Sequence, residues 1–140
     1  MNALDAALEL LVPRQTPVVH VHGDRPASGT AIPLLARGEQ LVLIDGRRLS
    51  ARRLRRLAQD AGLVVDRELV VLPGLSAPAF VVEDGVESMG WFCNAFATVP
   101  PGRAQGSFLI TAATRLARHR PLVGWLGRLV PGRMVIARRP

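Results

Sequence analysis

The chain has 140 residues, of which 49% are hydrophobic, and this composition supports the core of one domain and excludes general disorder. All 18 basic residues are arginines and the net charge is +7, which favours an anionic partner. The arginines are scattered and lack interleaved aromatic residues, which argues against a nucleic-acid-binding protein, and a single cysteine excludes an internal disulfide and fits a cytoplasmic location.

The first segment predicts a helix, a strand and a loop. Leucines and alanines at helical spacing predict an amphipathic helix over residues 1–11, and the absence of a basic n-region indicates that this helix is not a signal peptide. Residues 17–21 are β-prone, residues 22–29 are expected to form a loop, and residues 31–36 are expected to form one or two helical turns. No apolar run reaches membrane-spanning length.

The clearest pattern is strand, helix, strand between Gly38 and Pro73. Leu41–Ile44 is a short apolar run typical of a strand buried on both faces, and it stops at Asp45. Ser50 is expected to cap a helix that Gly62 ends in a left-handed conformation. Residues 63–72 then form a second strand. This alternation predicts a layered α/β sheet, in which ligands bind at the carboxyl ends of strands.

The second half of the chain is expected to be mainly helical. Residues 79–82 are a short β-like run, and residues 86–97 read as a helix broken by Gly90. Residues 134–137 read as a final strand. We therefore predict one α/β domain with a short mixed sheet and flanking helices. Its expected parts are an N-terminal helix and loop (1–33), a strand–helix–strand unit (34–73), a mainly helical insertion (74–131) and a closing strand (132–140).

Two groups of side chains could carry metal or nucleophile chemistry. His20 and His22 lie on one face of the expected strand and could begin a metal site with Asp24, but solvent-facing histidines at a strand end explain the pattern better. Cys93 could be a nucleophile, but no histidine stands at a supporting spacing, and a small buried apolar residue is the simpler interpretation. We therefore predict no metal site.

The best candidate site follows the buried strand. Asp45 could hold a hydroxyl or an amine, and Arg47 or Arg48 could hold a carboxylate or a phosphate. A capping and solubilising turn would explain these residues equally well. Trp91 and Phe92 could line an apolar substrate pocket, make a protein interface, or belong to a second core.

Several blocks resemble the C-terminal half of class I S-adenosylmethionine-dependent methyltransferases. The run LLARGEQLVLID at 34–45 is similar to the segment that leads into the fifth strand of that family, and LRRLAQDAGL at 54–63 is similar to the helix before its sixth strand. The run GRMVIARR at 132–139 is similar to the closing antiparallel strand. The region between is similar to the variable substrate-side insertion. The resemblance implies a truncated Rossmann-like fold.

The resemblance also implies a cofactor and a set of contacts. The family holds S-adenosylmethionine with a glycine-rich loop after its first strand and an acidic residue that ends its second strand. No such loop is evident here, since Pro26 separates Gly23 from Gly29. An alternative alignment matches residues 18–29 to the first strand and its loop, and Asp45 would then end the second strand instead of the fifth. In this alignment the cofactor would contact Gly23, Asp24, Gly29 and Asp45. We expect the substrate to contact Arg47, Arg48, Trp91 and Phe92.

Two functions follow as expectations. The first is a methyltransferase-like protein of bacterial small-molecule or peptide tailoring, in which the missing glycine loop leaves open whether S-adenosylmethionine is bound at all. The alternative is a non-catalytic accessory protein that docks a partner enzyme or self-associates as a homo-oligomer. A truncated sheet favours the alternative because it leaves an open strand edge that a partner chain can pair with.

Overall fold

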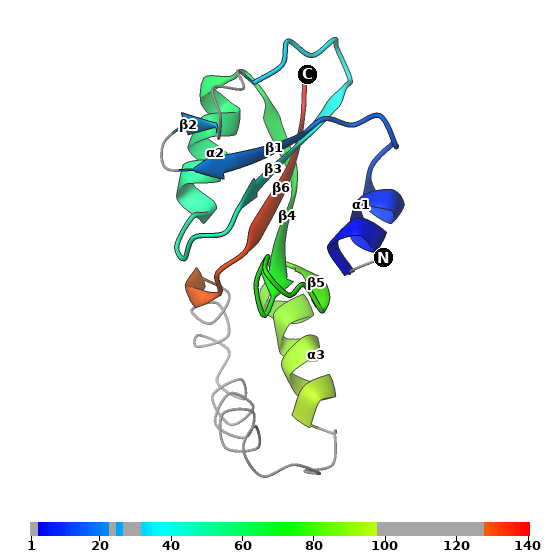
Figure 1. Ribbon diagram of the computed structural model, residues 1–140, viewed down its shortest axis with the longest axis vertical. Coiled ribbons are helices and arrows are strands. Elements are labelled where there is room, and N and C mark those ends of the chain that lie inside the picture. The colour runs from blue at the N-terminus through cyan, green and yellow to red at the C-terminus, as the bar shows by residue number, and fades with distance from the viewer. Residues whose placement is uncertain (1–2, 23–24, 27–31, 98–127) are drawn as a thin grey trace.

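The computed structural model describes residues 3–22, 25–26, 32–97 and 128–140, and Figure 1 shows them as helices around one twisted sheet. In chain order the elements are α1 (Ala3–Leu11), β1 (Val18–His22), β2 (Arg25–Pro26), β3 (Gln40–Asp45), α2 (Ala51–Asp60), β4 (Val64–Leu72), β5 (Phe80–Glu83), α3 (Val86–Ala97) and β6 (Arg133–Arg138).

The sheet is mixed, as the sequence predicted. Within the described residues six strands are arranged in the order β2-β1-β3-β6-β4-β5. β1 and β3 are parallel, whereas β6 is antiparallel to both of its neighbours, β3 and β4. β1, β3 and β4 therefore run in the same direction, and the last strand of the chain separates β3 from β4 (Figure 1).

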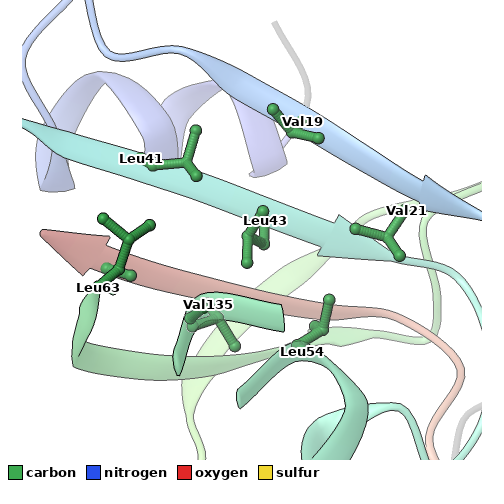
Figure 2. Close-up of a cluster of buried hydrophobic side chains, with 9 residues drawn as sticks. Val19, Val21, Leu41, Leu43, Leu54, Leu63 and Val135 are labelled. Carbon is green, nitrogen blue, oxygen red and sulfur yellow. The ribbon is translucent and has the colours of Figure 1, made fainter. Parts of the chain in front are cut away.

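β3 lies in the middle of the sheet and is buried on both faces. Leu41 and Leu43 pack with Leu54 of α2 in one cluster of buried side chains, which Figure 2 shows. Val42 and Ile44 belong to a second cluster, against which three leucines of α1 pack: Leu4, Leu8 and Leu11. Side chains alternate between the two faces of a strand, so a wholly apolar strand needs a helix on each side. The prediction of a strand sandwiched by helices is confirmed.

α2 begins and ends close to the predicted residues. Gly62 has a φ of +70°, its N–H donates to the Gln59 carbonyl at 2.9 Å, and the Leu63 N–H donates to the Ala58 carbonyl at 2.9 Å. This is the Schellman pattern that a glycine after a helix favours. Ser50 occupies the N-cap position, but its side chain makes no cap hydrogen bond. The predicted helix is confirmed, and the predicted side-chain cap is wrong.

Three other local predictions are wrong. Residues 32–36 are not helical, because a segment this short with a proline near its start cannot pay the cost of helix nucleation. The expected loop at 22–29 contains the two-residue strand β2, which pairs with β1. α3 continues through Gly90, since one glycine costs a helix only about 1 kcal/mol.

Residues 98–127, which make up much of the predicted helical insertion, lie outside the described residues. No helix among the residues that are described is both long and apolar enough to cross a membrane.

Candidate functional site

A pocket of about 240 Å³ lies where the parallel strands β1 and β3 end. We call it the strand-end pocket. The register places His20 of β1 beside Ile44 of β3, so the last residues of the two strands lie at the same edge of the sheet. The carboxyl ends of parallel strands are where α/β sheets bind ligands. The lining residues are His20, Val21, Ile44, Asp45, Gly46, Arg47 and Leu75.

Asp45 lines this pocket, but both oxygens of its carboxylate are already engaged. The Arg47 backbone N–H donates to Oδ1 of Asp45 at 2.9 Å. The Arg53 guanidinium, on α2, forms an ion pair with Oδ2. The Asp45 side chain is 0% exposed and that of Arg53 is 23% exposed. The carboxylate therefore fastens the loop and α2 to the end of β3, and a ligand hydroxyl would have to compete with these partners.

His20 and Arg47 are the polar side chains that are exposed at the strand-end pocket. Among the described residues, no acidic side chain forms a salt bridge with Arg47. Its guanidinium can therefore bind a carboxylate or a phosphate by donating two parallel hydrogen bonds. Arg48 is exposed in the same loop but does not line the pocket.

The other proposed contact residues lie elsewhere or outside the described residues. Trp91 is 73% exposed on α3, and neither it nor Phe92 lines the strand-end pocket. The Phe92 ring meets Phe80 edge-on, with 5.3 Å between the ring centroids. The three residues proposed for the cofactor loop, Gly23, Asp24 and Gly29, are not among the described residues. The structure thus brings Asp45 and Arg47 together and leaves Trp91 and Phe92 apart from them.

A second pocket, of about 470 Å³, lies between the first turn of α2 and the first turn of α3. We call it the interhelical pocket. This pocket was not predicted, because its walls come from three separate stretches of the chain and no local pattern joins them. Its lining residues are Leu49, Ala51, Arg52, Arg55, Asp84, Gly85, Val86, Met89 and Arg128.

Cys93 and His20 belong to no metal cluster among the described residues. Burial raises the pKa of the half-buried Cys93 thiol, so its nucleophilic thiolate form is disfavoured at neutral pH. No group of three or more His, Cys, Asp or Glu side chains that could hold a metal ion occurs among these residues.

Comparisons with protein-family models, with curated proteins and with solved structures give no match.

Proposed function

We propose that this chain is a methyltransferase-like α/β protein of small-molecule or peptide tailoring, and that it binds S-adenosylmethionine or a tailoring substrate in the strand-end pocket. The observation that supports the proposal is the position of this pocket. It lies at the carboxyl ends of two adjacent parallel strands, with an exposed guanidinium in its wall.

The direction of β6 also supports the proposal. The resemblance assigns β3 to the fifth strand of the methyltransferase fold, β4 to the sixth, and β6 to the closing antiparallel strand. β6 runs antiparallel to both β3 and β4 over six residues of each ladder. In a sheet built from hairpins, strands that are consecutive in the sequence would be neighbours. The position of the last strand between two earlier ones is therefore not explained by composition alone.

The size of the pocket limits what it can hold. Pockets for whole drug-sized ligands measure roughly 300–1,000 Å³, and this one measures about 240 Å³. It therefore takes one end of a ligand. S-adenosylmethionine has an amino-acid end with a carboxylate, which matches the Arg47 guanidinium, and the His20 imidazole can add one hydrogen bond.

Calorimetric titration of the full chain with S-adenosylmethionine tests the proposal. We expect saturable binding, and we expect Arg47→Gln to weaken it about tenfold, because a hydrogen-bonded charge contributes on the order of 1.5 kcal/mol. Arg48→Gln is the matched control, since it removes the same charge from the same exposed loop without touching the pocket. Titrations without saturable heat, or an equal loss in both variants, would contradict the proposal.

A second function, a non-catalytic interaction protein, is favoured by the outer edge of β1. β2 pairs only with Val21 and His22, so residues 18–20 have a single strand neighbour, β3, within the described part of the chain. Such an edge can add a strand from another copy. If the chain dimerises through it, light scattering should show a dimer that Val18→Lys disrupts. Leu10→Lys is the control, because Leu10 is 85% exposed on α1 and the variant adds the same charge away from any strand edge.

A further inference from the structure

We propose that the interhelical pocket is a separate binding site for an organic anion that has an apolar group, such as an aromatic or short-chain carboxylate, sulfonate or phosphate monoester. This inference does not depend on the methyltransferase-like function, because the strand-end pocket shares no lining residue with it.

The charges around the interhelical pocket leave a positive surplus. Asp84 is already neutralised by an ion pair with the buried Arg133. Arg55 donates through Nη2 to Oε2 of Glu68 at 2.7 Å, and this pairing raises the pKa of Arg55.

Two further guanidinium groups remain, those of Arg52 and Arg128. Both residues are exposed at the pocket, and neither pairs with an acidic side chain among the described residues. Two positive charges at one pocket attract an anion, and planar guanidinium groups bind carboxylates, sulfonates and phosphates through paired hydrogen bonds.

The same pocket has an apolar wall. Met89 is buried at the start of α3, while Leu49 is 63% exposed and Val86 is also exposed. Leu49 has a φ of +61°, a left-handed conformation that costs a leucine about 1–2 kcal/mol. A hydrogen bond of 3.2 Å from the Leu49 N–H to the Arg128 carbonyl stabilises it. This bond fixes the apolar wall next to one of the two surplus charges.

The combination selects the ligand class. A cavity of about 470 Å³ falls within the range of small-molecule sites. An inorganic anion would leave the leucine and valine surfaces in water, and a neutral apolar molecule would leave both guanidinium groups without a counterion. A molecule with one anionic group and one apolar group can pair with the guanidinium groups and cover the apolar side chains at the same time.

Fluorescence titration of the full chain with 1-anilinonaphthalene-8-sulfonate tests this inference, since the dye combines a sulfonate with apolar rings. We expect one saturable site per chain. Arg52→Gln and Arg128→Gln should each raise the dissociation constant about three- to tenfold, as expected for partly exposed charged contacts. Leu49→Asn should also weaken binding, because asparagine tolerates the left-handed backbone and removes the apolar side chain.

The controls separate a site from general attraction to a basic protein. Arg56→Gln removes the same charge from an exposed position of α2 that does not line the pocket, and it should leave the dye affinity unchanged. Decanoate should displace the dye, and the neutral decyl maltoside should not. Thermal unfolding of each variant checks that the fold is intact. Equal affinities in Arg52→Gln and Arg56→Gln, or equal displacement by both competitors, would overturn the inference. Arg47→Gln should not alter dye binding, so this inference and the proposed function can fail separately.

Discussion

Replacing Asp45 distinguishes a structural carboxylate from a ligand contact. The Asp45→Ala variant removes an ion pair with Arg53 and the acceptor of the Arg47 N–H. Removing one partner of a buried pair costs about 3–5 kcal/mol, because the other charge stays buried without compensation. Since Arg53 is 23% exposed, water recovers part of that cost, and we expect about 3 kcal/mol.

Two comparisons sharpen this value. Asp45→Asn keeps an oxygen for the Arg47 N–H and loses only the charge, so it should cost less, about 2 kcal/mol. Asp66→Ala removes a carboxylate from an exposed pair with Arg138, whose Nε lies 2.9 Å from Oδ1 of Asp66. Exposed pairs contribute about 0–1 kcal/mol, so this control should hardly change stability.

Urea denaturation measures all three variants, with the free energy of unfolding extrapolated to water. A cost for Asp45→Ala that is no greater than that for Asp66→Ala would refute the structural role of the Asp45 pair. If that variant were stable but failed to bind S-adenosylmethionine, Asp45 would instead be the ligand contact that the methyltransferase resemblance implies.

The remaining predictions concern two glycines and the cysteine. Gly62→Ala should cost about 1 kcal/mol, because φ is +70° but a Cβ would meet nothing within 4 Å. Gly132→Ala should cost about 3 kcal/mol in the same urea denaturation, because φ is +122° and a Cβ would lie 3.0 Å from the Val71 carbonyl oxygen; equal costs would contradict this difference. Cys93 should react more slowly with Ellman's reagent in the folded chain than in urea at pH 7–8, because its raised pKa lowers the thiolate fraction, and the rate should rise with pH. Faster reaction in the folded chain would indicate an activated thiol.

The elements that could be predicted from the sequence are those with local signals. The centre of β3, Leu41–Ile44, is wholly apolar, and α2 is followed by a glycine, so both elements were predicted to within one or two residues. The order of the strands was not predictable in this way. Whether β6 lies beside β3, beside β4 or between them depends on pairing over more than sixty residues, which no local pattern encodes.

The candidate site was found in part for the same reason. Asp45 and Arg47 directly follow a buried strand, which marks them from the sequence alone. The partner of Asp45 was not predicted, because Arg53 is one of several arginines on the polar face of α2 and no local pattern distinguishes it from the others. On that same face, Arg55 pairs with Glu68 of β4. Charge patterns on a helix give the exposed face correctly, but they do not show which charges meet an acidic residue from another element.

Among the described residues, two groups of arginines have different physical roles. Asp45 and Arg133 are direct neighbours in the β3–β6 register, yet each pairs with a residue outside that ladder: Asp45 with Arg53 of α2, and Arg133 with Asp84 just before α3. These buried pairs hold the two helices at one end of the sheet, where their first turns form walls of the interhelical pocket.

The second group consists of three exposed arginines that have no acidic partner among the described residues and that line the two pockets, namely Arg47, Arg52 and Arg128. Removing a charge from one of the buried pairs should therefore lower stability, whereas removing one of the three exposed pocket charges should lower affinity and leave stability nearly unchanged. The net charge of +7 does not require a nucleic-acid partner under this division, because part of the surplus is placed at pockets of small-molecule size.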